Sequence, residues 1–395
     1  MKQYWREFLL IFLYILLYIP ALGYSYVQPT DPVWVQRGVQ FYEALRHGDF
    51  AQTYTKYHPG VILMWITGIS YKIFYQFQRM HFGYVRDLFL YQVDLYSMYS
   101  FVAKFLIVTL IMVVLLYCYI VIKGLTNPSI AFWTVFFIIT EPFVVGNIRS
   151  IHVDALAAIF MFAAVISFWA SQAENFSSRK YLLLTGIFTG LALLTKISSL
   201  VLFPFFVFVL GVRPLWGRTP IKVGLSIKSL LLVCAFSFLV FFALFPSMWV
   251  NPVGTVQKIA VDGFLDTALN EESSRIVLGW GTVSLGYKYF SYFVQIVFRT
   301  SPLVFIGFLF GLLTFILHLF FNHKAIKPLN RKLKLLLMYS LIFILGYYLM
   351  ISISDKKIFR YILPMYPFLA IFAAYAVTKA FSFTHPVCLF HTPGV

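Results

Sequence analysis

The chain has 395 residues, of which 61% are hydrophobic and 11% are charged, and its mean hydropathy is +0.84. A water-soluble domain is far less apolar and carries about twice this share of charges, so the composition excludes a soluble globular protein and indicates lipid as the solvent. The formal net charge of +17 does not indicate nucleic-acid binding, because membrane proteins collect Lys and Arg in their cytoplasmic loops. Three scattered cysteines predict neither a disulfide framework nor a thiolate metal site.

Apolar segments recur along the chain and predict an all-α polytopic membrane protein with about 10 transmembrane helices. A signal peptide does not explain this pattern, because the apolar runs continue as far as Ala380. The stretch 181–212 is split at Thr195–Lys196, and we expect two short helices there. The predicted spans are residues 8–27, 98–122, 130–147, 154–173, 181–212 as a pair, 228–248, 297–321, 335–353 and 361–380.

The segment from Gly60 to Phe77 decides the topology, because it either spans the membrane or lies along its surface. If it lies on the outer surface, the basic segments fall on one side, including the dense cluster from Lys324 to Lys334. That side is then cytoplasmic by the positive-inside rule. This arrangement predicts a cytoplasmic N-terminus and places most acidic residues at or beyond the outer ends of the helices.

The same topology divides the chain into one transmembrane domain, residues 1–380, and a short tail, residues 381–395. The domain has a long first outer loop at 28–97, which contains juxtamembrane helices, and a later outer loop at 249–296. These two loops are where a polar substrate could be held, because the inner loops are short.

Asp31 follows the first predicted span, in the sequence Gln28-Pro29-Thr30-Asp31-Pro32. The Pro-flanked turn fixes a carboxylate at the outer membrane surface, which suits a general base. It suits an N-cap of the helix predicted at 34–46 equally well, because Asp before Pro is a common helix start. Both interpretations stay open.

Asp154 and Lys196 are ionisable residues at the edges of predicted spans. Asp154 opens the span 154–173, with Arg149 and His152 close before it. Acidic groups near the membrane interior usually face a protein interior or a wet cavity, although a helix cap also explains such a residue. Lys196 is expected to be the deepest cation in the chain and needs an anionic partner. It either extends to the lipid headgroups or holds a lipid phosphate.

Arg360 belongs to the segment Asp355-Lys356-Lys357-Ile358-Phe359-Arg360-Tyr361, which places three cations just outside the last predicted span. A planar guanidinium suits a phosphate. Alternatively, basic residues at a membrane edge bind lipid headgroups without selectivity. His58 begins a turn, His58-Pro59-Gly60.

Taken in order, these residues resemble the GT-C superfamily of polyprenyl-phosphate-sugar glycosyltransferases, in the branch of protein O-mannosyltransferases and lipid A aminoarabinose transferases. The family usually has Asp-Glu after the first span, whereas Pro32 follows Asp31 here, and Gly60 replaces the second proline of the turn. The matching features are an acidic residue after the first span (Asp31), the turn His58-Pro59-Gly60, an acidic residue opening a middle span (Asp154), Gly190-Leu191-Ala192-Leu193-Leu194-Thr195-Lys196, and Arg360-Tyr361-Ile362-Leu363-Pro364-Met365-Tyr366-Pro367.

The resemblance implies a GT-C-like bundle that moves a mannose-like hexose, or a related sugar, from a polyprenyl-phosphate carrier to an acceptor hydroxyl. Transfer would occur with inversion at the non-cytoplasmic face. The acceptor is a protein, a lipid or a glycan, and the expected location is a prokaryotic plasma membrane. The implied site has Asp31 and Asp154 as catalytic residues, Lys196, Arg360 and Tyr361 at the donor phosphate, and His152, His58 and Glu43 as acceptor-binding or orienting residues. A divalent metal ion, if one is bound, would lie at Asp154 and His152.

Two other functions are compatible with the residues alone. A transporter or lipid flippase could use Asp154 and Lys196 as an ion relay, but it predicts inverted repeats, and none is evident. A catalytically inactive GT-C-like protein is the other alternative, because Pro32 occupies the position of the family's second acidic residue.

Overall fold

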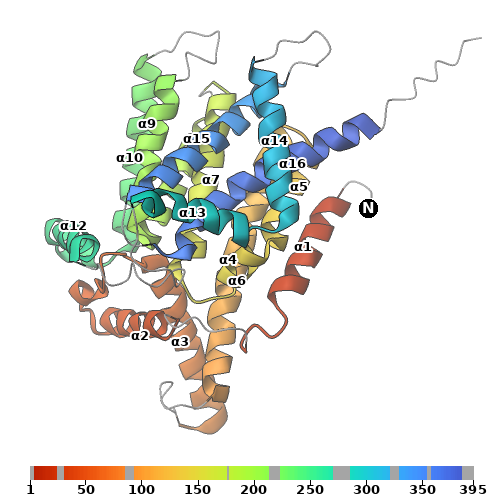
Figure 1. The fold of residues 1–395 in the computed structure, drawn as a ribbon. Helices are drawn as coiled ribbons and strands as arrows, with labels where there is room; N and C mark the ends of the chain where they lie inside the picture. The colour runs from red at the N-terminus through yellow and green to blue at the C-terminus, as the bar shows by residue number, and fades with distance from the viewer. Residues whose placement is uncertain are drawn as a thin grey trace, which may run out of the picture.

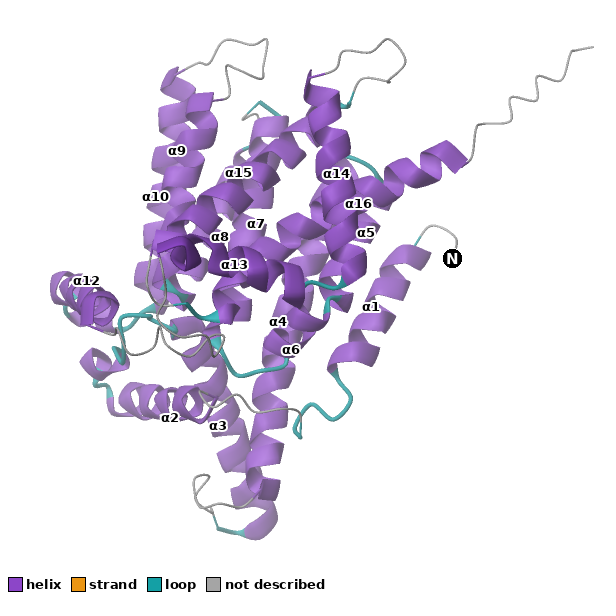
Figure 2. Ribbon diagram, in the orientation of Figure 1, coloured by secondary structure: helices purple, strands orange, loops and turns teal. Residues whose placement is uncertain are grey.

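The computed structural model describes residues 4–24, 31–84, 93–175, 178–212, 223–269, 285–320, 329–353 and 357–384. These residues form helices and loops without a strand (Figures 1 and 2), which confirms the all-α prediction. The helices are α1 Trp5–Tyr18, α2 Asp31–His47, η1 Phe50–Thr53, α3 Val61–Phe82, α4 Val93–Leu125, α5 Pro128–Thr140, α6 Pro142–Ile148, α7 Val153–Ala173, α8 Arg179–Thr195, η2 Ile197–Val201, α9 Leu202–Val212, α10 Val223–Leu244, α11 Ser247–Val250, α12 Pro252–Leu269, α13 Leu285–Arg299, α14 Pro302–Phe320, α15 Arg331–Ile353, η5 Phe359–Met365 and α16 Tyr366–Thr384.

Six of the described helical segments are long and apolar enough to cross a membrane, or seven if the bent pair α5 and α6 forms one span. The chain is therefore a multi-pass integral membrane protein. The prediction of about ten spans is not confirmed, because α1, α8 and α9 have only 14, 17 and 11 residues. The spans are Leu95–Leu125, Val153–Ala173, Gly224–Leu244, Pro302–Phe320, Arg331–Ile353 and Phe359–Phe381.

Helix α7 lies at the centre of the bundle, with all 21 of its residues buried. It packs against α8, the next helix in the chain, and against α4, α15 and α16 from more distant parts of the chain. Its sequence is rich in alanine, and small residues let neighbouring helices approach closely inside a membrane. Asp154 lies in its first turn, so the centre of the bundle presents a carboxylate at one end.

The opposite end of α7 is bordered by basic residues of other helices. Trp169 of α7 donates to the carbonyl oxygen of Lys332, and Arg331 donates to Asn175, both at 2.9 Å. Near the same end, Lys123 of α4 lies 2.5 Å from Glu7 of α1. A helix of this length is about 30 Å long, so it separates these basic residues from Asp154.

Helix α8 ends at Thr195 because the backbone of Lys196 is extended, with φ −154° and ψ 131°. The short helix η2 follows and α9 begins at Leu202, so the split apolar stretch forms two helices as predicted. Upstream, Gly190 packs against α10, where an added Cβ would lie 2.7 Å from the Ser237 carbonyl oxygen. This close crossing fixes the position of Lys196 relative to α10.

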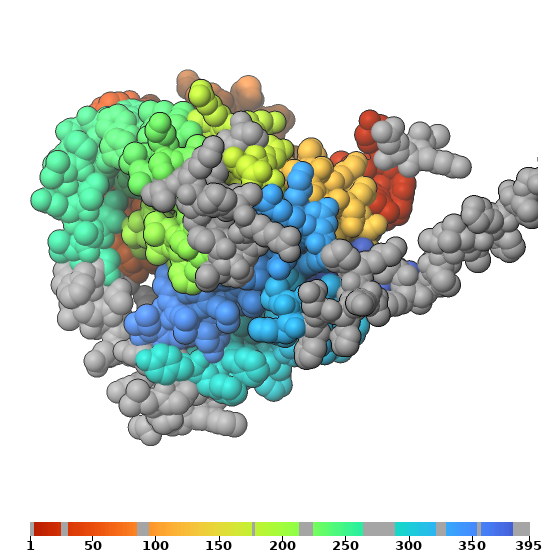
Figure 3. Space-filling model, turned by 90° about the horizontal axis from the view of Figure 1, so that it is seen from above, coloured from red at the N-terminus to blue at the C-terminus, as the bar shows by residue number. Residues whose placement is uncertain are grey.

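The helices α2, α3 and α12 lie near the end of the bundle at which α7 begins (Figure 1). In the view from above, α12 and α1 lie at opposite margins of the molecule (Figure 3). Helix α12 is joined to the loop after η1 by a 2.5 Å hydrogen bond from the Tyr54 hydroxyl to Asp262. Burial and this carboxylate raise the pKa of Tyr54, so its hydroxyl stays protonated and donates.

Candidate active site

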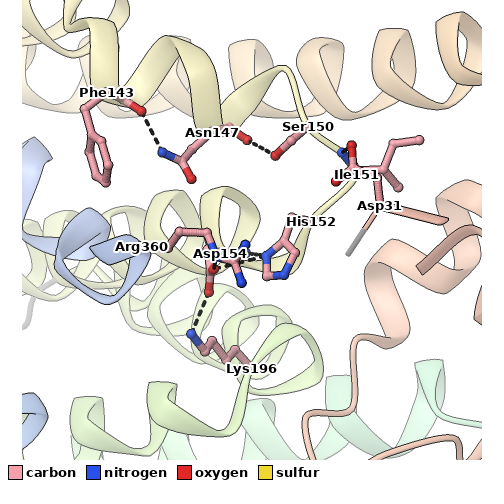
Figure 4. Close-up of polar contacts among 9 residues, drawn as sticks. All are labelled: Asp31, Phe143, Asn147, Ser150, Ile151, His152, Asp154, Lys196 and Arg360. Atoms are coloured by element: carbon pink, nitrogen blue, oxygen red, sulfur yellow. Dashed lines mark hydrogen bonds and ion pairs between the residues drawn. The ribbon is translucent and has the colours of Figure 1, made fainter. Parts of the chain in front are cut away.

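Three side chains converge on the carboxylate of Asp154 (Figure 4). Lys196 Nζ lies 2.5 Å from Oδ1, while Arg360 Nε and His152 Nδ1 each lie 3.0 Å from Oδ2. Asp154 is 3% exposed and the Lys196 side chain 7% exposed, so the pair lies almost entirely within the protein. We call these four residues the Asp154 cluster. Buried charges of this kind are stable only when they are paired closely.

The cluster is assembled by the ends of three elements that are distant in sequence. His152 precedes the first residue of α7, which places Asp154 in the first turn of that helix. Lys196 directly follows the last residue of α8, and Arg360 lies in η5 before α16. The structure therefore has the Lys196 ammonium against Asp154.

Asp31 lies beside the Asp154 cluster and not within it. The carboxylate is completely buried, and its Oδ2 accepts a hydrogen bond of 3.3 Å from the backbone N–H of Ile151. Ile151 immediately precedes His152, so the loop that leads into α7 connects Asp31 with the cluster (Figure 4). Asp31 is also the first residue of α2, whereas an N-cap residue precedes the first helical residue.

Trp34 of α2 connects the turn at His58 with the cluster. Its ring packs edge-on against His152 at 6.0 Å, and an added Cβ on Gly60 would lie 2.2 Å from the same ring. Gly60 has φ +59° and its N–H donates to the Thr195 carbonyl oxygen at 3.2 Å. A second proline at this position would have neither the N–H nor the left-handed φ, which is a physical reason for the departure from the family pattern.

An apolar cavity of about 670 Å³ opens next to the cluster. Lys196, His58 and Tyr361 line it, together with aliphatic and aromatic side chains from α8, α10, α12 and α15. The Lys196 ammonium also lies 4.0 Å from the centre of the Tyr361 ring. One boundary of a largely apolar space thus carries a cation and an imidazole.

Glu43 does not reach the cluster. It is a partly exposed residue of α2 and pairs with Arg46 at 3.5 Å and His47 at 3.9 Å on the same helix. Among the residues that the structure describes, no three His, Cys, Asp or Glu side chains are grouped as metal ligands. Because cations occupy both oxygens of Asp154, the site does not fit a divalent ion held by Asp154 and His152. Asp355 and Lys356 lie outside the described residues.

Lys104 is a buried cation that the sequence interpretation overlooked. It lies within the predicted span 98–122, and its exposure of 0% is lower than the 6% of Lys196. The position of Lys104 inside an apolar run could have identified it from the sequence, because a lysine within a membrane span needs an anionic partner.

The sequence model of the family described as dolichyl-phosphate-mannose-protein mannosyltransferase matches residues 53–259. This segment contains His58, Asp154 and Lys196. No curated protein matches the sequence.

Three solved structures share the fold. ArnT from Cupriavidus metallidurans bound to undecaprenyl phosphate has a TM-score of 0.61 and 14% identity, and the match covers 94% of this chain and 60% of that one. The Archaeoglobus fulgidus oligosaccharyltransferase in the apo form has a TM-score of 0.59 and 14% identity, covering 97% and 51%. AglB from Archaeoglobus fulgidus, in complex with an inhibitory peptide and a dolichol-phosphate, has a TM-score of 0.57 and 14% identity, also covering 97% and 51%. The chain thus spans 51 to 60% of the length of these structures.

Proposed function

Because the chain belongs to the dolichyl-phosphate-mannose-protein mannosyltransferase family, we propose that it transfers a mannose-like hexose, or a related sugar, from a polyprenyl-phosphate carrier to an acceptor hydroxyl. The observation that carries this proposal is the apolar cavity bounded by Lys196, a lysine held by Asp154. An isoprenoid chain is apolar and a phosphate is anionic, so this combination matches both ends of such a carrier.

The donor phosphate binds at Lys196, with Arg360 and Tyr361 beside it. When the bond from the anomeric carbon to the phosphate oxygen breaks, the leaving phosphodiester becomes a monoester and gains negative charge. Cations fixed at that oxygen lower the barrier because they need no reorganisation as the charge grows. Asp154 acts through them as a positioning residue, since it keeps Lys196 and Arg360 at 2.5 and 3.0 Å from its carboxylate.

Asp31 is the general base. It takes the proton of the acceptor hydroxyl as that oxygen bonds to the anomeric carbon, and this single displacement inverts the anomeric centre. The carboxylate is completely buried, so the acceptor must gain access to it before the proton moves. His152 and His58 orient the acceptor.

The reaction takes place at the non-cytoplasmic face. Lys123, Arg331 and Lys332 lie at the end of the bundle opposite Asp154, and basic residues of this kind collect on the cytoplasmic side. The N-terminus is then cytoplasmic, and a prokaryotic plasma membrane is the proposed location. The acceptor is a protein, a lipid or a glycan at the outer surface.

Purified protein in detergent with a carrier-linked, labelled sugar tests the proposal. The wild-type protein should release polyprenyl phosphate and label an acceptor. Lys196→Met should lower kcat/KM by about a hundredfold or more, the usual loss of one transition-state cation or donor. Lys228→Met, which alters an exposed lysine of α10, should leave the rate unchanged.

The Asp31→Asn variant tests the role of Asp31 as the base without altering the donor site. This variant should transfer no sugar but should bind polyprenyl phosphate with unchanged affinity. Full activity of this variant would exclude Asp31 as the base, and movement of the intact carrier across vesicles without cleavage would identify a transporter instead.

A further inference from the structure

Lys357 is a buried cation that lies three residues before Arg360 in the chain. Only 4% of the residue is exposed. Its ammonium donates hydrogen bonds to the backbone carbonyl oxygens of Ile351 at 3.2 Å and Ser352 at 2.8 Å. It also lies 4.8 Å from the centre of the Tyr292 ring, which belongs to α13. The structure therefore has this lysine in contact with α13 and α15, inside the protein.

The two carbonyl groups belong to the last turn of α15, which ends at Ile353. The last carbonyl groups of a helix have no partner within the helix, and the helix dipole adds partial negative charge there. An ammonium satisfies both conditions, and hydrogen bonds from a charged donor are stronger than neutral ones. Lys357 therefore connects the end of α15 with the chain that leads into η5.

This connection joins the apolar cavity to its polar boundary. Ile351 lines the cavity from α15, and Tyr361 lines it from η5. Arg360, next to Tyr361, lies 3.0 Å from the Asp154 carboxylate. A polyprenyl phosphate carries its anionic and apolar parts on one molecule, so it binds tightly only if both parts of the site are held at the matching separation.

We propose that Lys357 is a positioning residue of the donor site. It holds η5 against the end of α15, so that Arg360 and Tyr361 meet the phosphate of a carrier whose isoprenoid chain lies in the apolar cavity. This inference rests on the proposed function in so far as the carrier binds there. Lys357 acts through η5 and does not touch the reacting atoms.

Two ligands separate this role from a general loss of structure. Polyprenyl phosphate needs the cavity and the cations, whereas the uncharged polyprenol of the same chain length needs only the cavity. Lys357→Met should weaken binding of the phosphate by about ten- to a hundredfold and change binding of the alcohol by less than about twofold. Equal losses for both ligands, or unchanged binding of the phosphate, would overturn the inference.

The chain offers a conservative variant and a matched control. Lys357→Arg should restore most of the phosphate affinity, because a guanidinium has enough donors for both carbonyl groups. Lys123 also donates a hydrogen bond, to Glu7, and lies 5.7 Å from the centre of the Tyr119 ring, but at the opposite end of the bundle. Lys123→Met should leave both affinities unchanged. A selective loss of phosphate binding in Lys123→Met would contradict a role specific to Lys357.

Amide hydrogen exchange tests the positioning without any ligand. In the purified protein, Lys357→Met should speed exchange in η5 by about tenfold or more and leave the middle of α7 unchanged. Unchanged exchange in η5 would overturn the inference whatever the protein binds, because the charge would then act on the phosphate only from a distance. Faster exchange in a protein that transfers no sugar would support Lys357 as the residue that holds η5, and only the proposed function would fail.

Lys357→Gln serves if Lys357→Met folds poorly. Its amide keeps hydrogen-bond donors for the end of α15 but lacks the charge. Phosphate binding and η5 exchange should lie between those of the wild-type protein and Lys357→Met, with polyprenol binding unchanged. Loss of polyprenol binding as large as that of polyprenyl phosphate would contradict the inference here too.

Discussion

Removing the carboxylate of Asp154 should destabilise the protein strongly, because it leaves Lys196 and Arg360 without their shared partner. Asp154→Asn keeps the shape of the side chain and removes only the charge. The ion-pair distances are 2.5 and 3.0 Å, and the Lys196 and Asp154 side chains are 7% and 3% exposed. Breaking a buried pair of this kind costs about 3 to 5 kcal/mol of unfolding free energy.

A double-mutant cycle isolates the interaction. Adding Lys196→Met to Asp154→Asn removes one of the two stranded cations, so the double variant should be more stable than the sum of the single losses predicts. A coupling energy of about 1 to 3 kcal/mol is expected. The same cycle between Asp154 and the distant Lys123 should give a coupling near zero.

Reversible unfolding of the detergent-solubilised protein, followed by tryptophan fluorescence, provides these free energies. Additive effects of Asp154→Asn and Lys196→Met would mean that the two side chains do not form a stabilising pair, because contacting charges cannot be energetically independent. An Asp154→Asn variant as stable as the wild-type protein would contradict the pair as well.

Three further substitutions test the packing that positions the site. Gly60→Ala should cost about 1 to 3 kcal/mol more than Gly48→Ala, because both glycines have positive φ but only Gly60 would clash with Trp34; equal losses in thermal unfolding would exclude the clash. Gly190→Ala should destabilise by about 1 to 3 kcal/mol at the crossing with α10, whereas Gly211→Ala, which meets open space in α9, should be neutral or stabilising; the reverse order would contradict the close crossing. Tyr54→Phe should speed amide hydrogen exchange in α12 without changing global stability by more than about 1 kcal/mol, because it removes one hydrogen bond to Asp262; unchanged exchange would mean that other contacts hold the helix.

The fold class and the family could be predicted from the sequence. Apolar runs need only the length rule for a bilayer to be recognised as helices, and the all-α prediction is confirmed. The resemblance to the GT-C superfamily is also confirmed, by the family match over residues 53–259 and by the fold shared with ArnT and AglB. The number of membrane spans was harder to predict from the sequence, because α8 and α9 share one apolar stretch and each is too short for a full span.

Residues of the site could be predicted from the sequence only where their polarity differed clearly from that of their neighbours in the chain. Lys196 did so because it interrupts an apolar stretch, and the structure has it in contact with Asp154. Lys104 was passed over because the apolar run continues on both sides of it. Glu43 was selected for its charge alone, and the direction of a side chain on an amphipathic helix depends on packing that composition does not encode.

A structure of the protein bound to a polyprenyl phosphate would test whether Lys196 and the apolar cavity form the donor site. We expect the phosphate within hydrogen-bonding distance of Lys196 Nζ and the isoprenoid chain in the cavity between α8, α10 and α15. A phosphate bound at a site remote from Lys196, with the chain in the separate apolar groove between α3 and α4, would contradict it.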